Sequence, residues 1–591
     1  MYKCMTCLLF LSIGLSACSK SSDDEPVQDM STDVDSGVVD MTPAPVEDMD
    51  RIDMPQPDAD MGVDMPSEDL GLDMNPPVDM PADMSDDMGP SIELPDLSSV
   101  TAAVEADLAK NNATAASISI YYKGEVIWLG GFGTMVDGDG VERKPDKDTL
   151  FMIGSDTKKH AVIAYLQHVA LQQASVDSTI HELVPALEHG RAPDFTSASA
   201  HDLMSNQGGL VDDLGFFPVA TQDAQLERYI ISSLPGRSYQ LAPPGEFYNY
   251  SNPSFSMLGL MTEKIDSQER YWADIIQQDL FSPLGMNRSV ARKSEVDANH
   301  ATGMGFTRPG EGTLGRVLLK DTWEDAYVRP AGLIWSTPSD QMRLAKFLIE
   351  GNEAILPDHL REDMLSAKTP LYPDIPGSYG YGVLRYDGVN LGANFYPDVT
   401  LIEHGGNTIT HTSKFYVLPE QNFAISILGN GMGDNFDQTA AELIRLFVEL
   451  PAPGPRPEVT FDPTVLDKLV GDYYDPNNLG RAIVTRQGDR LVLNMPDVTA
   501  AGVPYEPDLV PISSYVWRAN IQNQDMAITF FEGSDSTVYL THRAFVAIKT
   551  PPLMNGLQAP LPEVEVSPER IKETLLRAKM LDPLRSTIRP W

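Results

Sequence analysis

The feature that most constrains how this chain can fold is a long acidic segment near its start. Between Ser21 and Pro90 there are 21 acidic residues and one basic residue, Arg51, so this stretch carries 20 of the 42 net negative charges of the 591-residue chain. Its other residues are mainly Met, Pro and Val, without aromatic side chains. Such a composition cannot bury enough apolar surface to offset the entropy of the chain. We therefore expect a disordered acidic tether over residues 18–92, followed by the folded part of the protein.

The acidic segment also limits what the protein can bind. Binding to a polyphosphate needs clustered Lys and Arg, so nucleic acid is not an expected partner. The aspartates recur as Asp-Met pairs at irregular short intervals, a spacing that matches no calcium-binding loop. As a flexible coil, about 70 residues would reach roughly 45 Å, and repulsion between like charges would lengthen that reach.

All three cysteines lie within the first twenty residues, so no disulfide framework is possible downstream. Lys3 precedes an apolar run, Leu8–Leu15, that is too short to span a bilayer as a stable helix. Small residues follow this run. Together these features predict a signal peptide over residues 1–17.

The end of this signal, Leu15-Ser-Ala-Cys18, resembles a bacterial lipobox. The resemblance implies cleavage before Cys18 and acylation of its thiol and new amino terminus, which would leave no free thiol to act as a nucleophile. Ser19, not an aspartate, follows Cys18. By the same resemblance, this implies an anchor at the periplasmic face of the outer membrane, or at the cell surface where no outer membrane exists. An ordinary signal peptide with a chance cysteine is the alternative.

Globular patterning begins near Ile92 and mixes helices with hairpins. The residue Gly124 follows Lys123 between two strand-like runs, which predicts a tight hairpin. The expected helices are Ser98–Lys110, Lys159–Gln173, Phe255–Ile265 and Ser339–Glu350, and the expected strands are Ala116–Tyr122, Glu125–Gly131, Thr412–Leu418 and Phe423–Leu428. Helices interspersed with antiparallel strands predict an α+β fold over residues 93–450.

A proline-rich break over residues 451–457 separates this region from a different pattern. Short alternating runs punctuated by Gly and Asp predict a small all-β barrel or sandwich over residues 458–550. The segment Leu469-Val-Gly-Asp-Tyr473 at its start resembles small lipocalin-like domains. In the tail, residues 551–591, Ser567-Pro568 predicts the start of a short basic helix that ends near Met580.

Ser155 and Lys158 form a Ser-x-x-Lys motif at the start of a predicted helix. The i,i+3 spacing places both side chains on one helix face, about 5 to 6 Å apart between Cβ atoms. A serine hydroxyl attacks poorly until a base takes its proton, and lysine can do so if desolvation or a nearby cation lowers its pKa. The helix start also favours developing negative charge. By itself the motif is more typical of a serine N-cap followed by an exposed lysine, and only its context favours a catalytic pair.

Two further motifs follow in order along the chain. Tyr250-Ser-Asn252 lies 95 residues after Ser155, and His404-Gly405-Gly406-Asn407 precedes an expected strand. These motifs, together with the block Phe151-Met-Ile-Gly-Ser155-Asp-Thr-Lys158, resemble the class C β-lactamase and DD-peptidase family of penicillin-binding proteins and related serine hydrolases. The resemblance covers roughly Leu97 to Leu450.

This resemblance implies an antiparallel sheet flanked by helices, beside a helical subdomain, with the active site between them. It also implies that Ser155 is the nucleophile and that Lys158 and Tyr250 activate it. A phenol near cations can have a lowered pKa, so Tyr250 is expected to act as a base and to pass the proton of Ser155 to the leaving group. Asn252 is expected to bond both Lys158 and a substrate amide.

The third motif is expected to form the far wall of the site. His404 would stand beside the substrate, and the glycines Gly405 and Gly406 would let the backbone approach a substrate carbonyl closely. The amides of Ser155 and Asn407 would then form an oxyanion hole.

The chain departs from the family pattern at two places. Asn206-Gln-Gly-Gly-Leu210 replaces the usual His-Thr-Ser-Gly-Leu, and His404 replaces the lysine of strict β-lactamases. An imidazolium at His404 would hold a substrate carboxylate only below its ordinary pKa of about 6.5. We therefore expect an esterase, a D-amino-acid peptidase or a DD-carboxypeptidase. A true class C-like β-lactamase and an inactive penicillin- or peptidoglycan-binding lipoprotein are the alternatives.

No cofactor is expected. The sequence has no His-Glu-x-x-His or paired-histidine pattern, which disfavours a zinc hydrolase and predicts no metal site. The expected partners are a small ester, amide or peptide, with peptidoglycan fragments and β-lactams among the candidates, and a membrane that receives the lipid anchor.

Overall fold

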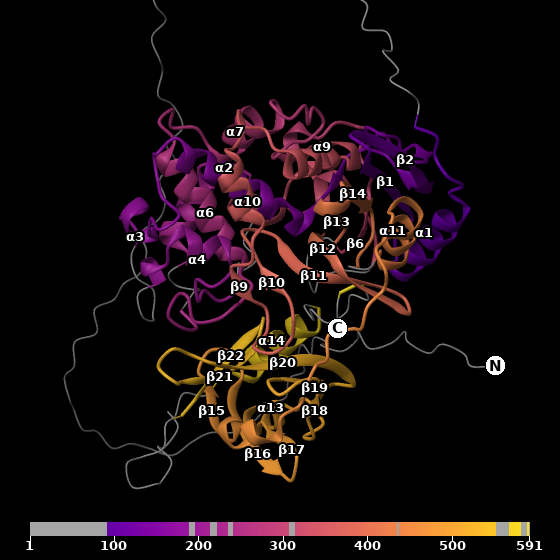
Figure 1. The fold of residues 1–591 in the computed structure, drawn as a ribbon. Helices are drawn as coiled ribbons and strands as arrows, with labels where there is room; N and C mark the ends of the chain where they lie inside the picture. The colour runs from indigo at the N-terminus through magenta and orange to yellow at the C-terminus, as the bar shows by residue number, and fades with distance from the viewer. Residues whose placement is uncertain are drawn as a thin grey trace, which may run out of the picture. The chain divides into compact units, whose positions relative to one another are not determined.

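Two eight-stranded antiparallel sheets organise the part of the chain that the computed structural model describes (Figure 1). The described residues are 92–187, 195–212, 221–234, 240–306, 314–433, 436–550, 566–580 and 588–589. The predicted signal peptide (1–17), Cys18 and all but the last residue of the predicted tether (18–92) lie outside them. No helix within these ranges is both long enough and apolar enough to cross a membrane.

The first sheet forms the core of the region that precedes the proline-rich break, and some of its neighbouring strands are far apart in the sequence. Its neighbouring strands, in spatial order, are β2 (Glu125–Gly133), β1 (Ala115–Tyr122), β14 (Phe423–Gly429), β13 (Thr412–Leu418), β12 (Asn394–Asn407), β11 (Leu384–Leu391), β10 (Ser378–Tyr379) and β9 (Thr369–Pro370). Strand β1, near the start of this region, pairs with β14, near its end, so the sheet brings the two ends of the region together. Short two-stranded pairs are β3 (Met135–Val136) with β4 (Glu142–Arg143), β5 (Phe151–Met152) with β8 (Trp335–Ser336), and β6 (Gly303–Gly305) with β7 (Gly315–Val317).

The turn between β1 and β2 shows how local sequence sets this sheet. Lys123 and Gly124 have φ angles of 52° and 88°, the left-handed pair that a two-residue hairpin requires. Beyond the turn, Tyr122 pairs with Glu125. The predicted hairpin is therefore confirmed.

Helices cover both faces of this sheet (Figure 1). The α-helices before the proline-rich break are α1 (Ser98–Lys110), α2 (Lys158–Ala170), α3 (Ile180–Leu183), α4 (Ala200–Met204), α5 (Gln225–Ser232), α6 (Asn252–Ile265), α7 (Trp272–Ile276), α8 (Arg329–Gly332), α9 (Pro338–Glu350), α10 (Asp358–Leu365) and α11 (Asp437–Phe447). Helices α1 and α11 pack together on one side, and α9 packs against β1 and β14 on the other. Helix α2 is buried along most of its length and packs against α6 in the helical part.

The second sheet forms a C-terminal β domain, which we define by its strands. In spatial order they are β17 (Arg490–Asn494), β16 (Gly480–Gln487), β15 (Gly471–Asp475), β22 (Phe545–Lys549), β21 (Val538–His542), β20 (Gln524–Glu532), β19 (Val516–Ile521) and β18 (Val510–Pro511). Leu493 N donates to Pro507 O at 2.8 Å and Leu509 N donates to Leu491 O at 3.0 Å, so the segment before β18 pairs with β17 and brings the sheet towards closure. The result is the barrel-like all-β domain that the sequence predicts.

Three helices accompany this domain: α12 (Leu466–Leu469), α13 (Pro496–Ala500) and α14 (Pro568–Met580). Ile571 and Leu575 of α14 lie in the apolar core of the barrel. The last described residues reach the first sheet, because Ile588 O accepts a bond from Asn390 N at 2.8 Å and Arg589 Nε donates to Glu403 at 3.0 Å.

The α+β class is confirmed, and most predicted elements occur close to their expected bounds. The helix expected over Lys159–Gln173 ends earlier, at Ala170. Gln172 adopts a left-handed conformation with φ of 58°, which a helix cannot continue through.

Candidate active site

Ser155 lies in a tight turn between β5 and α2. The turn is a single 3-10 segment, Gly154–Thr157, and α2 begins directly after it at Lys158. Gly154 has a φ of 57°, a conformation that glycine adopts without strain. As a result, the amine nitrogen of Lys158 lies 3.1 Å from the hydroxyl oxygen of Ser155.

The amine of Lys158 is fully buried and has three polar neighbours. Besides Ser155, its nitrogen lies 2.7 Å from Asn252 Oδ1 and 2.7 Å from the backbone oxygen of Ala331. Burial holds the pKa of Lys158 well below its usual value, and the nearby Arg543 guanidinium lowers that pKa further.

These three contacts suit a neutral amine. Both carbonyl oxygens can only accept, so they take the two N–H groups of an uncharged lysine. The remaining lone pair then faces Ser155, whose hydroxyl can donate its proton along the 3.1 Å contact. This arrangement has the geometry that a base for Ser155 requires.

Tyr250 completes this group from the other side of the amine. Its ring centroid lies 4.8 Å from Lys158 Nζ. Desolvation raises the pKa of Tyr250 to about 12, although Arg543 and a hydrogen bond with Ser155 act in the opposite direction. The expectation of a lowered phenol pKa is therefore wrong: at neutral pH the Tyr250 hydroxyl keeps its proton and is a proton donor.

The loop that departs from the family pattern braces this second motif. Asn206 has a φ of 57°, its side-chain oxygen accepts from Ser251 N at 3.0 Å, and its backbone oxygen accepts from Asn249 N at 2.7 Å. Ser251 also caps α6, since its hydroxyl accepts from Ser254 N at 3.4 Å. Tyr250 is thus held between a bonded loop and a helix start.

The side chain of Asn252 is oriented by Asp212. Asp212 Oδ1 accepts from both the backbone and the side-chain nitrogen of Asn252, at 2.9 and 3.0 Å. With its nitrogen bonded to a carboxylate, Asn252 presents its oxygen to Lys158. No local sequence signal marks Asp212 or the carbonyl of Ala331 for these roles, because both reach the site only through the tertiary fold.

His404 on β12 stands on the far wall of the site and is a neutral imidazole. Its Nδ1 lies 2.7 Å from the carbonyl oxygen of Gly405, which can only accept, and its Nε2 lies 3.1 Å from the hydroxyl of Tyr379. Burial holds the pKa of His404 well below its usual value, and Lys158 lowers that pKa further. The expectation that His404 titrates at its ordinary pKa is therefore wrong, and His404 offers no cation at neutral pH.

Strand β12 packs closely against the Gly154–Thr157 turn that carries Ser155. A Cβ atom added to Gly406 would lie 1.8 Å from Ile153 O and 2.8 Å from Ser155 N, so only glycine fits there. A Cβ added to Gly154 would lie 2.8 Å from Asn407 N. The backbone nitrogens of Ser155 and Asn407 thus both lie at the contact between β12 and this turn, which is where the expected oxyanion hole would place its two N–H donors.

An ion pair behind the nucleophile fixes the turn. Lys159 bonds the carboxylate of Asp156, and both side chains are fully buried. Lys159 Nζ also lies 3.8 Å from the ring centroid of Phe415 on β13, which ties the turn to the sheet. Breaking one half of a buried pair leaves an uncompensated charge, so this pair holds the turn in place.

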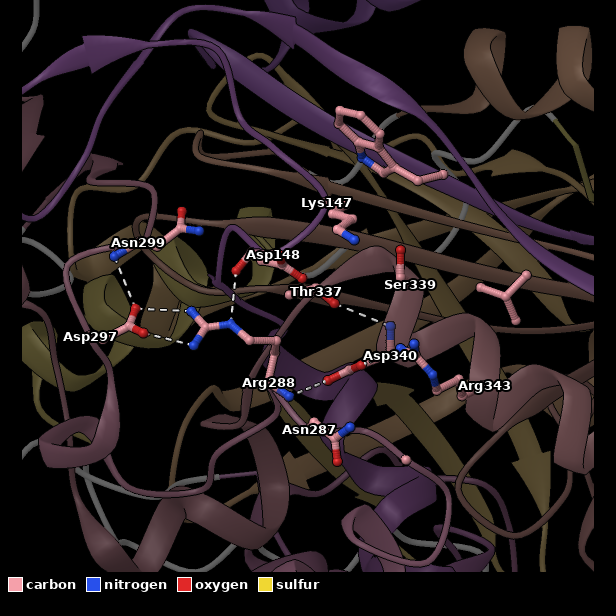
Figure 2. Close-up of a pocket in the computed structure, with 13 residues that line it drawn as sticks. Lys147, Asp148, Asn287, Arg288, Asp297, Asn299, Thr337, Ser339, Asp340 and Arg343 are labelled. Carbon is pink, nitrogen blue, oxygen red and sulfur yellow. Dashed lines mark hydrogen bonds and ion pairs between the residues drawn. The ribbon is translucent and has the colours of Figure 1, made fainter. Parts of the chain in front are cut away.

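A separate cavity of about 690 Å³ lies away from these residues (Figure 2). Its two arginines are already engaged: Arg288 bonds Asp297 at 2.7 and 2.9 Å, and Arg343 bonds Asp340 at 2.6 Å. Asp340 also accepts from the backbone of Arg288, so these charges secure the start of α9. In the ranges that the structure describes, no cluster of three or more His, Cys, Asp or Glu could hold a metal ion.

The family of this protein follows from comparison with models of known protein families. A model of the beta-lactamase family matches residues 100–449. The chain belongs to the beta-lactamase family. Members of this family are serine hydrolases, which agrees with the residues gathered around Ser155.

Relatives of this beta-lactamase family member are distant. Protein flp of Staphylococcus aureus strain MW2 is 22% identical over 330 residues, which are 55% of this chain and 61% of flp, so the match spans about three fifths of that relative. The octameric penicillin-binding protein homologue from Pyrococcus abyssi has a TM-score of 0.51 at 22% identity, and the match covers 77% of this chain and all of that one. SurE has a TM-score of 0.55 at 18% identity, with 76% and 98% covered. A second SurE structure contains D-Leu.

Proposed function

We propose that this protein is a lipid-anchored serine hydrolase that cleaves an ester or amide through an acyl-enzyme on Ser155. The observation that carries the proposal is the 3.1 Å contact between Ser155 Oγ and a buried lysine nitrogen whose N–H groups are taken by two carbonyls. The neighbouring buried Lys159 differs in this respect, because its amine is paired with the carboxylate of Asp156.

The residues support a two-step acyl transfer. As Ser155 Oγ attacks the substrate carbonyl, its proton passes to Lys158, and the oxyanion is held by the amides of Ser155 and Asn407. Tyr250 then gives its proton to the leaving oxygen or nitrogen, and the proton on Lys158 restores it. In the second step, water gives a proton to Lys158 as it attacks the acyl carbonyl, and Ser155 leaves with that proton on its oxygen.

The substrate we favour is an ester, or an amide of a D-amino acid. Family members with a permanent cation on the third motif can hold a β-lactam carboxylate there, whereas His404 is neutral here. A D-amino-acid substrate is supported by SurE, a structure of similar fold that has been solved with D-Leu. It accords with the peptidase and carboxypeptidase activities expected from the three motifs.

Hydrolysis of a substrate panel tests this proposal. The mature chain and Ser155→Ala would be assayed with p-nitrophenyl butyrate, D-Leu p-nitroanilide, acetyl-D-Ala-D-Ala and a chromogenic cephalosporin. We expect turnover of an ester or D-amino-acid substrate that Ser155→Ala abolishes. Preferred turnover of the cephalosporin would indicate a β-lactamase instead. No turnover of any compound, with no acylation of Ser155, would indicate a non-catalytic binding protein.

The anchor is the second part of the proposal and rests on the lipobox-like Leu15-Ser-Ala-Cys18. Acylated Cys18 would fix the mature chain to a membrane, and the acidic segment after it would keep the hydrolase away from the bilayer surface. Detergent-phase partitioning of wild type and Cys18→Ser tests this. We expect only the wild type in the detergent phase; two aqueous proteins would contradict the anchor.

A further inference from the structure

The C-terminal β domain reaches the active site through one side chain, Arg543. This residue lies in the two-residue turn between β21 and β22, where His542 pairs with Phe545. Ala544 N donates to His542 Nδ1 at 3.1 Å, which steadies the turn. Arg543 therefore projects from the tip of a short hairpin.

The guanidinium group of Arg543 contacts two residues of the site directly. Its Nε donates to Asp212 Oδ2 at 2.7 Å, and its central carbon lies 4.0 Å from the centroid of the Tyr250 ring. Lys158 Nζ lies 4.8 Å from that same centroid. Arg543 and Lys158 therefore both contact the ring of Tyr250.

An apolar contact fixes the hairpin in this position. Phe247, three residues before Tyr250, stacks on Phe531 of β20 with centroids 5.1 Å apart and meets Tyr539 of β21 at 4.9 Å. These rings belong to one buried cluster, together with Val211, Leu241, Ala242 and Val546. Glu246 adds bonds to the backbone and hydroxyl of Ser534 at 2.6 and 2.5 Å. The second motif is therefore clamped to the β domain on the side where Arg543 enters.

Within the described part of the chain, the guanidinium group of Arg543 uses one edge for hydrogen bonding. Among the described residues, Nε makes the single hydrogen bond of this side chain, and the two terminal nitrogens make none. The side chain is 24% exposed, whereas that of its partner Asp212 is 5% exposed. A guanidinium edge with two parallel N–H groups matches the geometry of a carboxylate.

We propose that the free edge of Arg543 receives a carboxylate group of the substrate, so that the C-terminal β domain supplies the permanent cation that His404 does not. The proposal rests on acylation of Ser155 as described above and names the substrate class: an acyl compound with a free carboxylate close to the scissile bond. Arg543 is a specificity-determining residue in this account, and it takes no part in proton transfer.

Protection of Ser155 from a fluorophosphonate probe tests the proposal without requiring turnover. The probe's labelling rate would be measured on the mature chain with increasing acetyl-D-Ala-D-Ala or its C-terminal carboxamide, which differ only in the carboxylate. We expect acetyl-D-Ala-D-Ala to half-protect Ser155 at a concentration at least about tenfold lower than its carboxamide does. This factor is typical of a hydrogen bond to a charged group. Arg543→Met should remove that difference and Arg543→Lys should restore part of it.

The control is Arg518→Met, which removes an exposed arginine of the same domain that is paired with Asp525 at 3.4 Å. This variant should keep the wild-type difference. Because Arg543→Met removes the cation that is paired with the buried Asp212, Asp212→Asn with Arg543→Met would be measured beside it, with a thermal melt for each. Equal protection by the two compounds in wild type, or a difference that survives in Arg543→Met, would overturn the proposal. Absence of any labelling of Ser155 would instead overturn the proposed function.

Discussion

The amine nitrogen of Lys158 lies 3.1 Å from the hydroxyl oxygen of Ser155, and its two other polar neighbours are carbonyl oxygens that can only accept. In the uncharged form of Lys158, this arrangement would point the nitrogen lone pair towards Ser155. It depends on the burial that holds the pKa of Lys158 well below its usual value. In the mechanism we propose, the reactivity of Ser155 follows from how Lys158 is buried and bonded.

Replacement of this lysine should remove the base. Lys158→Met is expected to lower kcat/KM by about 10² to 10⁴, the range for loss of a general base. Lys158→Arg introduces a permanent positive charge, and because arginine is already protonated at ordinary pH it cannot take the proton of Ser155, so this variant should be similarly impaired. Steady-state kinetics on the best ester substrate measures both. An active Lys158→Arg enzyme would show that charge at this position, and not basicity, is what Ser155 needs.

Removal of the Tyr250 hydroxyl should affect poor leaving groups most. With a pKa of about 12 the phenol is a proton donor, and an amine leaving group needs that proton whereas p-nitrophenolate does not. Tyr250→Phe is expected to lower kcat/KM for a D-amino-acid amide at least about tenfold more than for the matching p-nitrophenyl ester. The extra loss on the amide is the contribution of one general acid. Equal losses on the two substrates would contradict the assignment as leaving-group acid.

The pH profile should report Lys158. The base must be neutral, so kcat/KM should rise as pH increases through its lowered pKa and then level off. Charged groups that face it are Arg543 and Asp212, of which Arg543 lowers its pKa and Asp212 raises it. Arg543→Met should therefore raise the pKa of Lys158 and move the rising, acidic part of the pH profile to higher pH. An acid limb that stays in place would mean that another group governs it.

Neutral His404 makes a further prediction about pH. Because its pKa is held well below the usual value, the imidazole should not titrate near neutrality. The ratio of kcat/KM for a carboxylate-bearing substrate to that for its neutral analogue should stay constant between about pH 6 and pH 8. A ratio that falls across this range would restore the imidazolium that sequence alone suggests.

The fit of β12 against the nucleophile turn offers a matched pair of glycine variants. A Cβ at Gly406 would lie 1.8 Å from Ile153 O, whereas a Cβ at Gly405 would have Ser413 O at 3.2 Å as its nearest neighbour. Gly406→Ala should displace the strand from the oxyanion site and lower kcat by about 10² to 10³, the effect of losing one donor. Gly405→Ala should be far milder. Comparable kinetics and melting temperatures for the two variants would contradict this packing.

Local patterns predict the elements of this fold well where a single segment decides the outcome. Helix α1 at Ser98–Lys110 and strand β13 at Thr412–Leu418 have the bounds that sequence indicates. The protonation states could not be predicted in the same way. The pKa values of Tyr250 and His404 are set by burial among neighbours from other parts of the chain.

Residues that act through distant contacts were also invisible to pattern analysis. Asp212 lies in no motif, yet it orients Asn252 from a loop 40 positions earlier. Arg543 lies in a different domain, and nothing in its own hairpin indicates that it meets Tyr250. Tertiary contacts such as the packing of Phe247 against Phe531 and Tyr539 bring the two together.

The most direct test of the account is the mass of the protein after reaction with a fluorophosphonate. Wild-type protein should gain one adduct, which peptide mapping assigns to Ser155, and Lys158→Met should gain it far more slowly. Ser155→Ala should gain none. An adduct that persists in Ser155→Ala, or that maps to another residue, would contradict the assignment of Ser155 as the nucleophile activated by Lys158.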